Sequence, residues 1–308
     1  MMLLTLFVIL TLGFFVIRLM PGSPFDDPEL SPAMRQMLEE KYGLDQPIHR
    51  QYFRYMGRLL QGDWGVSLKI EPMRPVFQVI GERIGVTLVL NMLSLLLAFP
   101  LGMLAGSRAA LNTFRRGQDR LTDGMVILSL SIPSFVMASL LQSLLGYRSG
   151  LFAIAYRPLG SPGEQLYSLI LPVLALSFYP MATLCRYLRG ELLENLSSDY
   201  MLLARCKGLT EKQALHRHAL GNAMVPLMPV IVPMFTNVLA GSLVVEKIFN
   251  IPGVGGLLTR SIQAGDHSLT VAVLIFYALI HLLTVLITDL SYGLMDPRIR
   301  LGGGHREH

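Results

Sequence analysis

The sequence predicts an all-α integral membrane protein with six transmembrane helices and a small helical external segment after the first of them. Hydrophobic residues make up 52% of the 308 residues and charged residues only 15%. Soluble domains carry about 25% charged residues, because the protein surface that faces water needs a shell of charged side chains. The third observation is length: six apolar runs approach or exceed the roughly 20 residues that cross about 30 Å of hydrocarbon. Soluble enzymes and disordered chains are disfavoured by the same numbers.

Polar connections separate the six apolar runs. The runs cover residues 1–20, 84–106, 121–145, 166–185, 223–245 and 269–291. The run 84–106 is the clearest. The run 1–20 is short, but it lacks the basic start and the Ala-x-Ala end of a signal peptide, so we expect an uncleaved helix.

The basic residues predict the orientation in the membrane. Thirteen of the 26 Lys and Arg residues fall in the connections 107–121 and 186–222 and in the tail 292–308. Cytoplasmic loops collect Lys and Arg, so these segments and both termini are expected in the cytoplasm. The net charge of +5 then follows from topology, and nucleic-acid binding is not needed to explain it. The two cysteines, Cys185 and Cys206, are too few for a disulfide scaffold and are expected to be free thiols.

The segment 21–83 is expected outside, since long segments translocate despite their charges. A helix is predicted over 31–44, with Ser31 as its N-cap and Gly43 at its end. A second amphipathic stretch follows over 47–60. The segment therefore reads as a small folded external part and not as a linker.

Helix signals are dense in the connection 186–222. A short helix is predicted over 199–207, capped by Ser198 and stopped by Gly208. Thr210 and Gln213 form a capping box that opens a second helix running to 220. Gly221 and Asn222 are expected to loosen this helix before the next span. The sequence thus predicts two short helices joined by a sharp turn on the cytoplasmic face.

The turn between these helices carries apolar side chains beside basic ones. Leu203, Ala204 and Leu209 would be exposed unless a partner covers them, and Arg205 and Lys207 stand beside them. An apolar surface with a basic rim suggests a docking element. The alternative is a loop that packs on its own bundle. A DNA-binding helix-turn-helix is disfavoured, because the element is tethered to membrane spans at both ends.

Several stretches together resemble one family of transporters. The run 199–209 with 217–226 resembles the EAA loop of ABC-importer permeases, in the form of the oligopeptide, dipeptide and nickel permease family. The family's external, outer-loop and tail motifs resemble residues 19–25, 41–47, 62–65, 245–255 and 296–300. The residues of these motifs are most similar to those of the B-type subunits of the oligopeptide branch. The Glu and first Ala of the general EAA pattern are absent, since Leu202 and Leu203 precede Ala204.

The resemblance implies a multi-pass subunit of the bacterial cytoplasmic membrane that couples ATPase motion to alternating access for oligopeptides. It implies a homologous second permease subunit, two ATP-binding subunits and an extracytoplasmic solute-binding protein as partners. ATP and Mg are expected on the partner subunits, and neither catalysis nor a cofactor is expected on this chain. In agreement, the sequence has no Gly-x-x-x-x-Gly-Lys-Ser/Thr phosphate loop.

The resemblance also assigns candidate residues. The expected ATPase-coupling residues are Asp199, Ala204, Arg205, Lys207, Gly208 and Leu209. Candidates near the binding protein are Trp64, Glu246, Pro252 and Gly253. Independently of the resemblance, their positions inside apolar runs make Asn91, Pro229 and His281 candidates along the pathway. No metal site is expected.

For some of these residues a plainer role competes. Trp64 is expected to pack against neighbouring residues. Glu246 and Asp266 are expected either to face the binding protein or to stay solvated. His281 is expected to be neutral and to form a hydrogen bond with a neighbouring helix. Pro226, Pro229 and Pro233 bend the fifth span for a pathway or for packing alone.

Other functions remain as alternatives. Within the same family, the alternative cargo to an oligopeptide is a dipeptide, nickel or a metallophore. A stand-alone secondary transporter or channel would show inverted repeats and charged groups deep in the spans. A membrane-embedded enzyme would need clustered His, Asp or Glu residues at membrane depth. The sequence leaves the length of the peptide open.

Overall fold

The computed structural model describes residues 2–19, 25, 31–116, 119–236, 238 and 242–295. In these ranges the regular structure is helical, apart from an isolated antiparallel bridge between Val66 and Pro75. The all-α prediction is confirmed. Residues 20–24 of the expected motif 19–25, and the whole expected motif 296–300, lie outside the described residues.

The chain divides into two compact units. The first combines Met1–Thr87 with Pro252–Leu282, and the second combines Leu88–Ile251 with Leu283–His308. Helix α4 (Val76–Arg116) contributes to both, and so does α14 (His267–Met295).

The first unit also contains α1 (Met2–Leu19), α2 (Pro32–Tyr42), α3 (Ile48–Leu60) and α13 (Val254–Ala264). Both helices expected in the external segment are present. Ser31 caps α2 by accepting the Met34 N–H at 3.3 Å, and Gly43 ends it with φ +69°.

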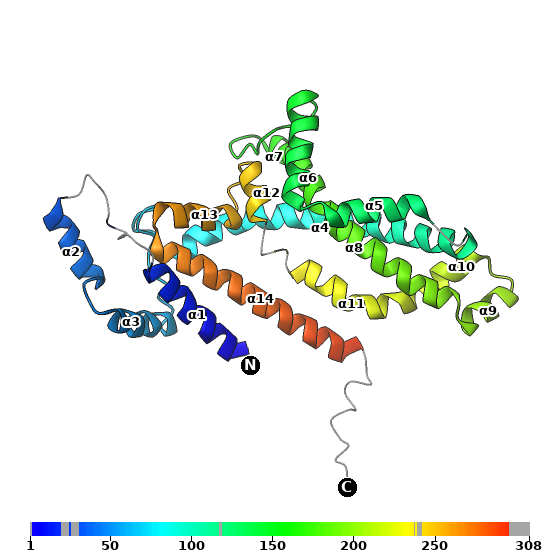
Figure 1. Ribbon diagram of the computed structural model, residues 1–308, viewed down its shortest axis with the longest axis horizontal. Helices are drawn as coiled ribbons and strands as arrows, with labels where there is room; N and C mark the ends of the chain where they lie inside the picture. Colours follow the sequence, from blue (N-terminus) through cyan, green and yellow to red (C-terminus); the bar gives the residue numbers. More distant parts are fainter. Residues whose placement is uncertain are drawn as a thin grey trace, which may run out of the picture. The chain divides into compact units, whose positions relative to one another are not determined.

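Aromatic contacts join α3 to α1. The Tyr52 hydroxyl lies 2.8 Å from the Thr11 hydroxyl, and the ring of Tyr55 stacks on Phe14 at 5.3 Å. α1 also packs against α14 through a cluster of Ile17, Val271 and Ile275, and Figure 1 shows the two helices side by side.

The second unit is built around α8 (Ile170–Leu196), which packs against three other helices. Those helices are α5 (Arg120–Ser131), α6 (Ser134–Leu141) and α11 (Leu220–Thr236). Between them lie η1 (Gln142–Arg148), α7 (Pro162–Ser168), α9 (Asp199–Cys206), α10 (Glu211–Ala214), η2 (Leu215–Ala219) and α12 (Leu243–Ile248). Figure 1 shows α9 and α10 together beyond one end of α8.

Four helices of the described chain are long and apolar enough to cross a membrane. They are Val76–Arg115, Ile170–Leu196, Glu211–Thr236 and His267–Ser291, and Leu4–Leu19 forms a shorter apolar helix. These five helices overlap five of the six predicted runs. The fifth run differs at its end, because α11 stops at Thr236 and α12 begins at Leu243.

The third predicted run, 121–145, is not one straight helix. The run is divided into two helices, Arg120–Ser131 and Ser134–Arg148, which meet at an angle of 101°. Proline disfavours the α conformation in the residue before it, and Ile132 is accordingly extended with φ −88° and ψ 118° before Pro133. The exact number of six spans therefore stays a prediction.

Candidate functional site

The connection between α8 and α11 contains the turn that the sequence predicts. After α9, the Gly208 N–H donates to the Arg205 carbonyl at 2.9 Å and the Leu209 N–H donates to the Ala204 carbonyl at 3.3 Å. This pair of bonds is a Schellman motif, which requires a left-handed residue. Gly208 has φ +84°, a conformation that glycine adopts without the strain of a Cβ.

The starts of the two short helices differ. The Thr210 hydroxyl accepts the Gln213 N–H at 3.4 Å, and Gln213 Oε1 accepts the Thr210 N–H at 3.0 Å. The predicted capping box is thus confirmed. Ser198 stands at the N-cap of α9, but its hydroxyl donates backward to the Asn195 carbonyl at 2.5 Å and does not cap the helix.

The second helix of the connection does not loosen before the fifth span. Residues Glu211–Thr236 form a continuous helix in which η2 makes a single π-helical turn. Gly221 and Asn222 lie inside α11, so the expected interruption there is wrong. The start of α10 is therefore also the start of a long apolar helix.

One face of the connection is buried in its own unit. Met201 is 1% exposed and Ala204 7% exposed. Together with Leu215 they join a core that includes Leu192 of α8 and Ala223 of α11. The expectation that Ala204 is exposed unless a partner covers it is wrong, because its side chain already lies in this core.

The opposite face of α9 is apolar and open. Leu202 and Leu203 are each 57% exposed, and Asp199 and Lys207 are exposed beside them. The sequence reasoning placed Leu203 on this surface and missed Leu202. Helical periodicity separates the two faces, because Met201 and Leu202 point about 100° apart. We call Leu202 and Leu203 the α9 patch.

Arg205 links α9 to the end of α8 and to Phe114 of α4. Its Nε donates to the Met201 carbonyl and its Nη2 to the Leu196 carbonyl, both at 3.3 Å, and its guanidinium lies over the Phe114 ring at 5.4 Å. The expectation that Arg205 belongs to the basic rim of a docking element does not fit these contacts.

A second contact ties α10 to the end of α4, since Arg115 Nε donates to Glu211 Oε2 at 2.6 Å. The connection is thus fixed to α4, α8 and α11.

Two of the candidates near the binding protein are buried. Glu246 is 0% exposed in α12, and Gly253 is buried at the start of α13, so neither presents a surface to a partner. Pro252 is half-buried. Trp64 packs against Phe77 with 4.5 Å between the ring centroids, as the packing alternative predicts.

Asp266 is also fully buried, so neither of its expected surroundings is correct. Its Oδ2 accepts the Ser67 hydroxyl at 2.6 Å and the backbone N–H groups of Leu68, Lys69 and Ile70 at 3.0 to 3.1 Å. Its Oδ1 accepts the Leu269 N–H at 3.2 Å, which caps the start of α14. The carboxylate is a structural anchor of the first unit.

The pathway candidates lie on three helices. Asn91 of α4 and Pro229 of α11 are half-buried in the second unit, and His281 of α14 is exposed in the first. Despite its three prolines, α11 is continuous over Leu220–Thr236. The pathway role of these residues stays a prediction.

The sequence reasoning missed a close approach between α4 and α8. A Cβ on Gly102 would lie 2.9 Å from the Met181 carbonyl oxygen, and one on Gly106 would lie 3.0 Å from the Cys185 carbonyl oxygen. The signal was available, because Gly102 and Gly106 form the Gly-x-x-x-Gly pattern that lets membrane helices approach closely.

Comparison with known proteins agrees with a membrane subunit. Residues 98–301 match the family model described as the binding-protein-dependent transport system inner membrane component. The dipeptide transport system permease protein DppB of Lactococcus lactis subsp. cremoris is 42% identical, with 97% of this chain and 96% of that protein covered. DppB of Bacillus subtilis is 35% identical, covering 96% and 94%. The oligopeptide transport system permease protein OppB of Salmonella typhimurium is 36% identical, covering 96% and 95%. The chain belongs to the family of binding-protein-dependent transport system inner membrane components.

Proposed function

We propose that this chain is the permease subunit of an ATP-driven importer for peptides. The printed functions of its full-length relatives, dipeptide and oligopeptide permeases, support the cargo class. The absence of a phosphate loop from the sequence supports ATP hydrolysis on separate subunits. The proposed assembly adds a homologous permease subunit, two ATP-binding subunits and a solute-binding protein. Both termini are proposed to lie in the cytoplasm.

The observation that carries the mechanism is the shared core beneath the connection between α8 and α11. Met201 and Ala204 of α9 pack in one cluster with Leu192 of α8 and Ala223 of α11. A displacement of α9 by an ATP-binding subunit would therefore move two long apolar helices with it, because packed cores transmit rigid motions and deform little. The α9 patch is the proposed contact for that subunit.

The length of the peptide is the finer question. The sequence motifs favour oligopeptides, and the relative at 42% identity is named for dipeptides, which makes dipeptides the second candidate. Uptake of labelled di-, tri- and pentapeptides, with and without this subunit, decides between them. Uptake of all three peptides that is the same with and without the subunit would contradict the peptide assignment.

The α9 contact is tested by replacing Leu203 with aspartate. A charge on the exposed apolar patch should reduce co-purification of the ATP-binding subunits and lower peptide uptake, while the amount of subunit in the membrane is unchanged. The matched control is Leu159→Asp, because Leu159 is fully exposed and lies in the connection between η1 and α7. Normal assembly and uptake by Leu203→Asp would refute the docking role of α9.

A further inference from the structure

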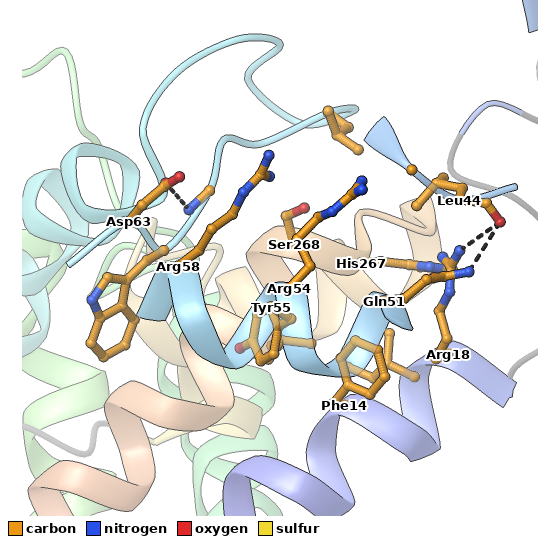
Figure 2. Close-up of a pocket in the computed structure, with 16 residues that line it drawn as sticks. Phe14, Arg18, Leu44, Gln51, Arg54, Tyr55, Arg58, Asp63, His267 and Ser268 are labelled. Atoms are coloured by element: carbon orange, nitrogen blue, oxygen red, sulfur yellow. Dashed lines mark hydrogen bonds between the residues drawn. The ribbon is translucent and has the colours of Figure 1, made fainter. Parts of the chain in front are cut away.

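The first unit contains a basic cavity that the proposed transport function does not use. Its volume is about 150 Å³, and it is lined by α1, α3, the loop after α3 and the first turn of α14 (Figure 2). The basic groups that line it are Arg18, Arg54, Arg58 and His267, and Asp63 is the one acidic residue among the lining residues.

Two of these arginines have no side-chain partner among the residues that the structure describes. Arg54 and Arg58 are four residues apart on α3, so they share one face of the helix, and Figure 2 shows both side chains extending in the same direction. Within the part of the chain that the structure describes, neither guanidinium forms a hydrogen bond or an ion pair. The Asp63 carboxylate instead accepts the Gly65 N–H at 2.9 Å. Both arginines are exposed, so the cavity opens to the surface with two positive charges that no described carboxylate neutralises.

The position of Arg54 is defined by its neighbour. A Cβ on Gly43 would collide with the Arg54 guanidinium, so the turn after α2 provides the space in which this side chain lies. On the far side of the cavity, Arg18 donates to the Leu44 carbonyl at 3.5 Å.

His267 adds an unsatisfied polar atom. Its Nδ1 is buried and has no hydrogen-bond partner among the described residues. Figure 2 shows the imidazole beside Arg18. A buried nitrogen without a partner is costly, and a bound acceptor or donor would relieve that cost.

Most of the remaining cavity wall is apolar, with Gln51 and Ser268 as its polar side chains. Phe14, Tyr55, Trp64 and Val271 contribute rings and aliphatic carbon to it. A ligand that fits this lining carries a negative head and an apolar portion, because guanidinium groups recognise phosphate and carboxylate while the wall excludes water.

The helix that carries the arginines also presents apolar side chains outward. Phe53 is 71% exposed and Leu60 is 91% exposed, and the two lie seven residues apart, on one side of α3. Basic residues beside exposed Phe and Leu are typical of helices that lie in the membrane interface. The cavity lies where α1 ends and the candidate span His267–Ser291 begins. A bilayer crossed by that span would have its lipid phosphates at this level.

We propose that this cavity binds the headgroup phosphate of an anionic phospholipid, with Arg54 and Arg58 as its charged ligands. Phe53 and Leu60 then lie in the boundary between headgroups and acyl chains. The inference uses the membrane location of the family and is independent of the peptide cargo. An acidic side chain of a partner protein is the rival occupant, but it would give no role to the exposed apolar side of α3.

The test is lipid binding to the full-length protein, purified with its partner subunits in a mild detergent. Native mass spectrometry counts bound phosphatidylglycerol over a concentration series, with phosphatidylethanolamine and inorganic phosphate as separate arms. The double variant Arg54→Gln/Arg58→Gln should bind phosphatidylglycerol roughly thirtyfold more weakly, since each of the two basic residues near a membrane surface contributes about 1 kcal/mol. Arg50→Gln is the control, because Arg50 is exposed on the same helix and does not line the cavity.

A further variant guards against a change in folding. Phe53→Ser keeps every charge and should weaken binding of phosphatidylglycerol while leaving the melting temperature in lipid-free detergent unchanged. The proposal is overturned if Arg50→Gln loses as much affinity as the double variant, or if the double variant binds lipid normally. It is also overturned if inorganic phosphate alone displaces the lipid at equal concentration, or if the double variant loses only its association with the solute-binding protein.

Discussion

Asp266 and Ser67 lie 199 positions apart in the sequence and are joined by a hydrogen bond of 2.6 Å, with both residues 0% exposed. The same carboxylate accepts three consecutive backbone N–H groups from the loop after Ser67 and the Leu269 N–H at the start of α14. A buried carboxylate is tolerated when several donors surround it. This single side chain therefore holds the loop after α3 against the start of α14.

Replacing Asp266 with asparagine should destabilise the first unit. The groups around the Asp266 carboxylate all donate hydrogen bonds to it, and the NH2 of asparagine cannot accept them. At least one buried N–H then loses its acceptor, which costs about 1–3 kcal/mol for each group. Thermal unfolding of the purified protein in detergent measures the effect. Asp63→Asn is the control, since the exposed Asp63 accepts one N–H. Equal melting temperatures for the two variants would contradict the anchor role of Asp266.

The close approach of α4 to α8 predicts a position that cannot accept bulk. Gly106→Leu should lower the melting temperature, because its Cβ would lie 3.2 Å from the Leu188 Cβ and overpacking costs about 1–3 kcal/mol or more. Gly85→Leu is the matched control on the same helix, since no described heavy atom lies within 4 Å of a Cβ built there. Melting of Gly106→Leu at the wild-type temperature would show that the helices separate without cost.

The features that could be predicted from the sequence are local ones. The turn at Gly208 and the Thr210 capping box depend on residues within four positions, so spacing alone identifies them. The role of Arg205 could not be predicted in this way, because the ring beneath it belongs to Phe114 of a different helix. The same is true of Asp266, whose donors come from another part of the chain.

The break in the third apolar run had a local signal that the hydropathy of the run concealed. Pro133 interrupts the run, but the prediction from the sequence treated residues 121–145 as one span. In this segment the extended conformation of Ile132 separates two helices. Apolar composition predicts that a segment is in the membrane, and it does not predict whether the segment crosses as one helix.

The capping box of α7 predicts a dependence on pH. Glu164 Oε2 accepts the Ser161 N–H at 2.9 Å, and this backbone hydrogen bond holds the pKa of the Glu164 carboxyl below its usual value. A lowered folded-state pKa gives a contribution that is complete above the unfolded-state pKa and is lost as the pH falls through the folded value. Amide exchange in α7, corrected for intrinsic rates, should therefore accelerate below about pH 4.

The control for α7 keeps the hydrogen bond and removes the titration. Glutamine also forms capping boxes, so Glu164→Gln should retain a protected α7 whose protection does not change between about pH 6 and pH 3. An acid-induced loosening of equal size in Glu164→Gln would assign the effect to other carboxyl groups.

Two neighbouring basic residues in the connection between α8 and α11 should give opposite results. Arg205→Gln removes two hydrogen bonds to helix carbonyls and the contact with Phe114, so α9 should open more often. A loss of about 1–2 kcal/mol corresponds to amide exchange in α9 that is roughly 5 to 30 times faster. Lys207→Gln should leave this exchange unchanged, because Lys207 is exposed and forms no ion pair within the described residues.

The two variants also separate bracing from docking in the proposed importer. If Lys207 contacts an ATP-binding subunit, Lys207→Gln should weaken co-purification of that subunit with no change in exchange. Arg205→Gln should lower uptake through a loosened α9, and a stabilising substitution elsewhere in the core should restore part of it. Unchanged exchange in Arg205→Gln would mean that the contacts of Arg205 do not hold α9 in place. The coupling would then have to pass through α10 and its ion pair between Arg115 and Glu211.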